Sequence, residues 1–188
     1  MRLFLERGFD KVSVAEVARA AEVSEATVFN YFPTKEDLVY ERMDSFEQEL
    51  LTAVRERAQG ESALYAFARF ILDRGDRAAA GDARRRVAEL TRLTTESPAL
   101  MARERQLVAR YTDALEALLR EQTGALADDI EPRVAAEAMM AFHRSLILFA
   151  RRLAASGATG TDFAPEIRAA GERALALLQG RLGDYARR

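Results

Sequence analysis

The stretch Ser13–Phe32, SVAEVARAAEVSEATVFNYF, carries the start signals of two short helices with a tight corner between them. Ser13 stands three residues before Glu16, the spacing of a capping box in which hydroxyl and carboxylate reciprocally satisfy backbone N–H groups. Ser24 is the second N-cap candidate, and Pro33 forbids continuation of the helix that follows it. Two helices of roughly two turns, joined by about three residues, have the shape of a helix-turn-helix.

The second of these helices carries polar and aromatic side chains on faces that its packing does not need. They are Glu25, Thr27, Phe29, Asn30 and Tyr31. Hydrogen-bonding and aromatic groups of this kind suit contacts in a DNA groove. We therefore expect this helix to be a DNA recognition helix.

Length and composition favour a helical protein without cysteine chemistry. The chain has 188 residues, 49% of them apolar and 31% charged, which suits one folded domain or two small ones. It has four prolines and ten glycines, and Ala, Leu, Arg and Glu dominate, which indicates an all-α protein. Because there is no cysteine, disulfides, thiolate metal sites and a cysteine nucleophile are excluded.

No apolar run approaches the roughly 18 residues that a membrane span needs, and no signal peptide is present. We therefore expect a cytoplasmic protein with no membrane partner. The net charge of −2 is not typical of a nucleic-acid-binding protein. The first 35 residues carry five basic and five acidic side chains, which cancel and count against strong electrostatic attraction to DNA.

Start signals along the rest of the chain predict longer helices. The residues typical of a first turn are Thr34, Ser62, Asp82, Ser97 with Pro98, Pro132, and Asp162 with Pro165. With the helix-turn-helix and a helix over Met1–Arg7, they give about nine helices and no strand. Met1–Arg7 has no N-cap signal, so we expect this helix to begin further upstream; a short first helix is the alternative.

The helix that begins at Pro132 is the most apolar of the chain. Its one polar line consists of Glu137, Arg144 and Arg151, and almost every other side is apolar. Such a helix is buried by neighbours on several sides, so we also expect a partner surface there.

No arrangement of side chains indicates an enzyme. His143 is the only histidine, and there is no Ser/His/Asp set, no histidine cluster with metal spacing and no glycine-rich phosphate loop. We expect neither a cofactor nor a metal. On the flank of an apolar helix, His143 is more often a satisfied interior histidine than a catalytic group. Arg84–Arg86 is interpreted as a solvated face, with a polyanion contact as the alternative.

Aromatic and methionine side chains of the C-terminal part form either the core or the lining of an apolar cavity between helices. His143, Arg144 and Tyr111 would serve as polar handles in such a cavity. The candidate ligand-binding residues are Phe67, Phe70, Leu90, Leu93, Tyr111, Met139, Phe142, His143 and Ile147.

Residues 3–39, LFLERGFDKVSVAEVARAAEVSEATVFNYFPTKEDLV, resemble the DNA-binding domain of TetR-family transcriptional regulators. The resemblance covers residues 1 to about 45. The motifs that carry it are Gly8-Phe9, the Ser13 capping box, Val17-Ala18 with Ala21, Val23-Ser24, Thr27-Val28-Phe29, Tyr31-Phe32, and Lys35-Glu36 with Leu38. The rest of the chain resembles the family in architecture alone, a variable helical regulatory domain whose last two helices usually form a dimer bundle.

The resemblance implies roles for individual residues. Ser13, Thr27 and Lys35 would contact phosphates, and such contacts fix the position of the protein on the DNA. Glu25, Asn30 and Tyr31 would face the major groove, where Asn can pair with adenine through two hydrogen bonds. Ser24 and Phe29 complete the set of predicted DNA-binding residues.

Three positions depart from the family pattern. Phe29 stands where the family usually has Tyr, so a phosphate-contacting hydroxyl is lost, and Tyr31 stands where His is common. Glu22 replaces the usual Gly at the corner, where a left-handed backbone would cost about 1 kcal/mol.

The sequence therefore predicts an all-α, homodimeric repressor with a DNA-binding domain over residues 1–45 and a ligand-binding and dimerisation domain over residues 46–188. Its partners would be a double-stranded DNA operator and a small apolar effector that releases it. Ser97-Pro98-Ala99-Leu100 and the helix after Pro132 also resemble regulators that sense acyl-CoA-like ligands. The alternative is a helical ligand-binding or interaction protein that retains the fold without binding DNA.

Overall fold

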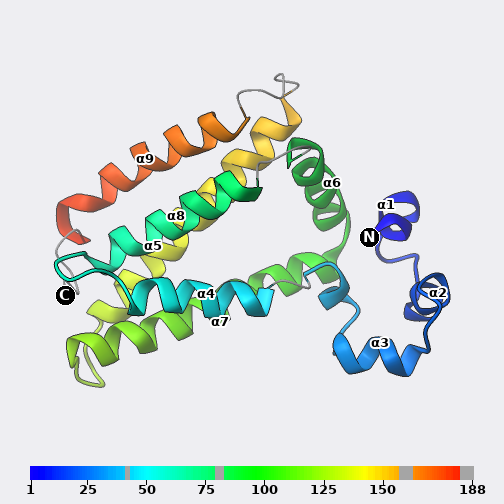
Figure 1. Cartoon of the computed structure of the whole chain (residues 1–188), viewed down its shortest axis with the longest axis horizontal. Helices are drawn as coiled ribbons and strands as arrows, with labels where there is room; N and C mark the ends of the chain where they lie inside the picture. Colours follow the sequence, from blue (N-terminus) through cyan, green and yellow to red (C-terminus); the bar gives the residue numbers. More distant parts are fainter. Residues whose placement is uncertain (41–42, 79–82, 157–162, 183–188) are drawn as a thin grey trace.

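The structure is a computed structural model that describes residues 1–40, 43–78, 83–156 and 163–182 (Figure 1). Over these residues it is all-helical, as predicted, with nine α-helices and no strand. The elements are α1 (Arg2–Arg7), α2 (Val14–Ala20), α3 (Glu25–Tyr31), the 3-10 turn η1 (Glu36–Leu38), α4 (Met43–Arg55), α5 (Ala63–Ala78), α6 (Ala83–Glu96), α7 (Pro98–Thr123), α8 (Glu131–Ala155) and α9 (Phe163–Leu182).

Three predicted N-caps form as expected. The hydroxyl of Ser13 accepts the N–H of Glu16 at 3.2 Å, and the Glu16 carboxylate accepts the N–H of Ser13 at 2.8 Å, which completes the capping box. Ser24 accepts the N–H of Thr27 at 3.0 Å at the start of α3. The hydroxyl of Ser97 caps α7 in the same way. The predicted start signals Asp82 and Asp162 lie outside the described residues.

The helix predicted to begin at Thr34 begins instead at Met43, after the short turn η1. The N–H and the hydroxyl of Thr34 both donate to Asp37, at 3.0 and 2.7 Å, so only half of the predicted capping box forms. Asp37 also accepts two hydrogen bonds from Arg103 of α7, at 2.7 and 3.1 Å. A partner distant in sequence thus fixes this turn, which explains why the local pattern predicted the wrong start.

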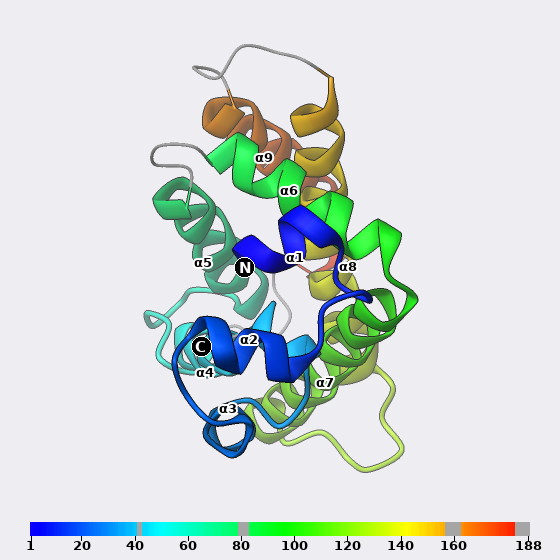
Figure 2. The same cartoon turned by 90° about the vertical axis from the view of Figure 1, so that its right-hand side faces the viewer.

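We call residues 1–40, with α1 to η1, the N-terminal unit, and α4 to α9 the body. The predicted domain boundary after residue 45 stays a prediction. Figures 1 and 2 show the unit at one end of the body, beside α6 and α7. Within the body, α8 contacts α5, α6, α7 and α9, so neighbours surround it on several sides as expected. None of the helices in the described part of the chain is long and apolar enough to cross a membrane.

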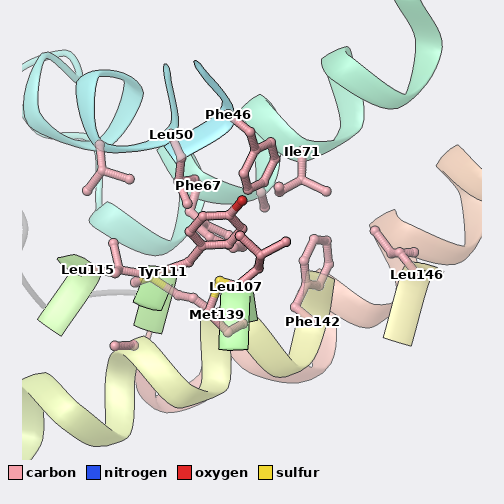
Figure 3. Packing of buried hydrophobic residues seen from close by; sticks show 14 of the residues in the cluster. Phe46, Leu50, Phe67, Ile71, Leu107, Tyr111, Leu115, Met139, Phe142 and Leu146 are labelled. Carbon is pink, nitrogen blue, oxygen red and sulfur yellow. The ribbon is translucent and has the colours of Figure 1, made fainter. Parts of the chain in front are cut away.

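The interior of the body lies between α4, α5, α7 and α8 (Figure 3). Its fully buried side chains include Leu50, Phe67, Leu115, Met139 and Met140. The helix α9 packs closely on α5, because a Cβ at Gly171 would collide with the side chain of Leu72. Apolar burial of this extent is the main stabilising contribution to a helical body.

Candidate nucleic-acid interface

The helix α3 lies at the edge of the N-terminal unit, away from α5, α8 and α9 (Figure 1). Its inner side packs through Val28, which is buried. Its outer side chains reach solvent, with 77% of Tyr31 and 47% of Phe29 exposed. Glu25 and Asn30 are exposed as well, so the three residues predicted to face the groove, Glu25, Asn30 and Tyr31, are all accessible.

The corner between α2 and α3 has the geometry of a helix-turn-helix. The N–H of Val23 donates to the carbonyl of Ala18 at 3.0 Å and closes the corner. Glu22 adopts a φ of 57°, the left-handed backbone that the sequence predicted at this position. This residue has a Cβ, so the corner carries a strain of about 1 kcal/mol that a glycine would not.

The three hydroxyl residues predicted to bind DNA, of which Ser13 and Thr27 were expected at phosphates, lie at helix N-termini in this structure. Ser13 and Ser24 cap α2 and α3, and Thr27 shares a 2.8 Å hydrogen bond with Ser24. All three remain at the surface, Thr27 half-buried and the others exposed. A phosphate contact by any of them stays a prediction.

Lys35 is directed toward the interior of the N-terminal unit. Its ammonium donates to the carbonyl of Phe9 at 2.7 Å and lies 4.2 Å from the centre of the Phe9 ring. The ring of Phe4 lies 5.1 Å from that of Phe9, which places the ammonium beside an aromatic pair. Lys35 therefore links the segment before η1 to the end of α1, a role that the sequence did not indicate. Its predicted phosphate contact stays a prediction.

An ion pair joins α1 to α2. Arg7 lies 2.7 Å from Glu16, whose carboxylate also closes the capping box. The hydrogen bond from the Ser13 backbone, followed by that from Arg7, lowers the pKa of Glu16 to about 2. Glu16 is therefore ionised at any physiological pH and keeps the two helices in place.

Polar pairs join the N-terminal unit to the body. Arg103 of α7 binds Asp37, the hydroxyl of Ser97 donates to Asp10 at 2.8 Å, and Arg92 of α6 donates to the carbonyl of Leu5 at 2.8 Å. Burial would raise the pKa of Asp37, but hydrogen bonds from Thr34 and Arg103 lower it below its ordinary value. No local pattern predicted these pairs, because the partners lie 66 or 87 residues apart in the chain.

The predicted ligand-binding residues mostly come together in the body. Phe67, Leu93, Tyr111, Met139 and Phe142 are buried in one apolar cluster, and Phe70 and Leu90 pack against it. Figure 3 shows Phe67, Tyr111 and Met139 directed toward one another from α5, α7 and α8. Ile147 is half-buried further along α8. The core interpretation and the pocket interpretation of this cluster both stay open.

His143 does not fully match the expected satisfied interior histidine. The residue is half-buried, while its Nδ1 is shielded from solvent and has no partner among the described residues. Its ring stacks on Phe46 of α4 with centroids 5.2 Å apart and an angle of 19° between the rings. Burial, and then the nearby charge of Arg74, lower the pKa of His143 to about 4. The contributions of Phe46 and Arg74 were not predicted, since helical spacing showed Phe46 only as a core position.

Comparison with known proteins identifies the N-terminal unit. Residues 1–41 match the family model described as bacterial regulatory proteins, tetR family. The HTH-type transcriptional regulator LuxR of Vibrio harveyi is 54% identical over 41 residues, which are 22% of this chain and 20% of that protein. The nucleoid occlusion factor SlmA of Pasteurella multocida (strain Pm70) is 32% identical over 117 residues, 61% of this chain and 56% of that protein. The chain thus spans about a fifth to just over half of these relatives.

A solved structure shares the complete fold. The transcriptional regulator FadR from Bacillus subtilis, in complex with stearoyl-CoA, superposes with a TM-score of 0.58 over 95% of this chain and 93% of that one. At 20% sequence identity this likeness shows the fold alone. The N-terminal unit thus matches the tetR family of bacterial regulatory proteins, and the fold of the chain as a whole is like that of this transcriptional regulator.

Proposed function

We propose that this protein is a homodimeric transcriptional repressor that binds an operator through α3 and leaves it when a small effector binds the body. The observation that carries the proposal is the outer face of α3, where Glu25, Phe29, Asn30 and Tyr31 are exposed on a helix whose inner side is buried. In a major groove, the Asn30 amide can pair with adenine, and the aromatic rings can contact thymine methyl groups. Ser13 and Thr27 lie at the surface of the unit, where each hydroxyl would turn from its present partner, Glu16 or Ser24, to contact a phosphate.

A dimer would supply the second recognition helix. The outer sides of α8 and α9 expose Val134, Leu148 and Leu177, the last of which is 86% exposed. Small residues such as Ala169, Ala176 and Gly180 on α9 are also exposed and permit close helix approach. Packing two copies through these helices would cover the apolar side chains and place two α3 helices about 34 Å apart, on successive major grooves.

The body would sense the effector. FadR of Bacillus subtilis carries stearoyl-CoA in its structure, and its fold is like that of this chain. An effector that favours a different placement of the N-terminal unit would act through the pairs on α6 and α7, including Asp37 with Arg103. A coupling of about 1–3 kcal/mol between effector and operator is usual for such proteins.

Selection of DNA by the full-length protein tests this proposal. Duplexes with a random central segment are incubated with the protein, and bound DNA is recovered and sequenced over several rounds. We expect a roughly palindromic site to be enriched, and Asn30→Ala to relax preference at one position of each half-site by about 1–3 kcal/mol. Gln48→Ala, which removes an exposed amide from α4 of the body, is the matched control and should leave the selected site unchanged.

A protein that keeps the fold without binding DNA is the second candidate. It is favoured by the balance of acidic and basic residues in the first 35 positions. Failure of the full-length protein to retain any duplex at low salt would support this candidate and reject the repressor.

A further inference from the structure

Among the described residues of the body, His143 has a buried ring nitrogen without a hydrogen-bond partner. His143 of α8, with Phe46 of α4 and Phe70 and Arg74 of α5, forms what we call the His143 junction. Buried polar atoms of native proteins nearly always have a hydrogen-bond partner, and each exception requires an explanation. Among the described residues, the Nδ1 of His143 is such an exception.

The junction brings two kinds of side chain to one aromatic ring. The imidazole of His143 stacks on Phe46 at 5.2 Å, and the guanidinium carbon of Arg74 lies 5.3 Å from the centre of the same ring. The ring of Phe70 lies 5.7 Å from that of Phe46 and closes the aromatic side. His143, Phe70 and Arg74 are half-buried, so the junction lies between the apolar interior and the surface.

The two arginines nearest the junction each have an ion-pair partner. On α5 and α4, Arg74 pairs with Glu49 at 2.5 Å. On α7 and α4, Arg110 pairs with Glu47 at 2.7 Å and lies 5.5 Å from the centre of the Tyr111 ring. The imidazole of His143 has no hydrogen-bond partner at Nδ1 among the described residues. An anion that reached this nitrogen would also lie near the positive charge of Arg74, which is close enough to lower the pKa of the imidazole.

We propose that the His143 junction binds the carboxylate of an amphipathic organic acid, with the acid's apolar tail lying along α8 toward Met139. Met139 lies one turn before His143 on the same face of α8, and its unbranched side chain adapts to an inserted tail. This inference rests on the proposed function, because it names the chemical class of the effector. The proposed ligand differs from an acyl thioester, which carries no carboxylate at the end of its acyl chain.

Dodecanoic acid is the probe, and dodecan-1-ol, of equal chain length, is its neutral match. Calorimetric titration of the full-length protein, without DNA and below the micelle concentration, gives both affinities. A charge-assisted hydrogen bond predicts that the acid binds at least about tenfold more tightly than the alcohol. Equal affinities, or no binding of the acid, would overturn the proposal. Dodecyl phosphate is titrated as a third ligand. If it binds more tightly than dodecanoic acid, the proposal that the junction recognises a carboxylate is rejected.

The single histidine of the chain offers a direct readout. Nitrogen-15 labelling of histidine gives one imidazole in the NMR spectrum. Dodecanoic acid should shift its resonances and raise the pKa of His143 from about 4, because a neighbouring anion favours the charged imidazolium. An imidazole that does not respond to a saturating acid contradicts the assignment, even if the acid binds elsewhere.

Two arginines provide a matched pair of variants. Arg74 and Arg110 each pair with a glutamate of α4 and each lie over an aromatic ring. Arg74→Met should weaken acid binding at least about tenfold, whereas Arg110→Met should leave it within about twofold. Equal losses in the two variants would reject the junction as the site. These titrations contain no DNA. Their outcome can therefore reject acid binding while operator binding is confirmed, or support acid binding while operator binding is rejected.

Discussion

The N-terminal unit and the body are stabilised in different ways. Helices α1, α2 and α3 have six or seven residues, too short to be stable alone, and they depend on caps and on ion pairs such as Arg7 with Glu16. The body has helices of up to 26 residues around an interior of buried Leu, Phe and Met side chains. Side-chain caps and an ion pair therefore add to the burial of Phe4, Phe9 and Val12 in the unit, whereas the long helices of the body are held mainly by apolar burial.

The same contrast applies to the groups that remain available for binding. In the unit, the available side chains, Asn30 and Tyr31 among them, point outward from α3. Among the described residues of the body, the Nδ1 of His143 is shielded from solvent and has no hydrogen-bond partner. Side chains that point outward from a helix suit a large partner such as DNA. A shielded polar atom without a partner suits a small molecule.

The largest expected effect lies in the body, where acid should destabilise the protein through His143. Its pKa is about 4 in the folded state and about 6.5 when unfolded, so the unfolded chain takes up the proton first as pH falls. The stabilising contribution is fully present above pH 6.5 and is lost between pH 6.5 and 4. The expected loss is about 3 kcal/mol of unfolding free energy between pH 7 and pH 4.

Urea unfolding followed by circular dichroism, at pH 7 and pH 4, measures this loss. His143→Phe keeps a ring against Phe46 and cannot take up a proton, so its loss of unfolding free energy should be about 3 kcal/mol smaller than that of the wild type. If the unfolding free energies of the wild type and His143→Phe fall equally between pH 7 and pH 4, the imidazole of His143 is not the cause of the loss in acid.

A smaller effect is expected from the caps of the unit. Ser13→Ala removes the hydroxyl that accepts the Glu16 N–H and should lower the unfolding free energy by about 1 kcal/mol. Ser145→Ala, at an exposed position inside α8 of the body, should leave stability unchanged or slightly raised, because alanine favours the helix interior. Urea unfolding of both variants checks the difference. Similar values for the two would contradict the importance of local caps in the unit.

The smallest expected effect is a gain at the corner of the helix-turn-helix. Glu22→Gly relieves the left-handed backbone and should raise the unfolding free energy by about 0.5–1 kcal/mol. Glu121→Gly, inside α7, should instead lower it by about 1 kcal/mol, because glycine is unfavourable within a helix. A loss from both substitutions, measured by thermal unfolding, would show that the corner is not strained.

The contrast between the two regions also explains what the sequence could predict. The caps at Ser13, Ser24 and Ser97 depend on residues three positions away, so their pattern was visible in the chain. The start predicted at Thr34 was wrong because Asp37 is bound by Arg103, which lies 66 residues further on. Interactions at that separation leave no local pattern.

The candidate sites follow the same rule. The exposed face of α3 follows from helical spacing, and the structure shows Glu25, Asn30 and Tyr31 accessible there as expected. The inward direction of Lys35 depends on Phe9, which the end of α1 brings near it. The unsatisfied nitrogen of His143 depends on how α4, α5 and α8 meet, and no property of a single helix reveals it.

The central claim, that the outer face of α3 recognises operator sequence, is tested most directly by fluorescence anisotropy. The selected duplex and an unrelated duplex are titrated with full-length protein at several salt concentrations. The wild type should prefer the selected duplex, Asn30→Ala should lose most of that preference, and Lys35→Ala should weaken binding to both duplexes and reduce the salt slope by about one. Equal affinity of the wild type for the two duplexes, or the same loss of preference in both variants, would contradict the claim.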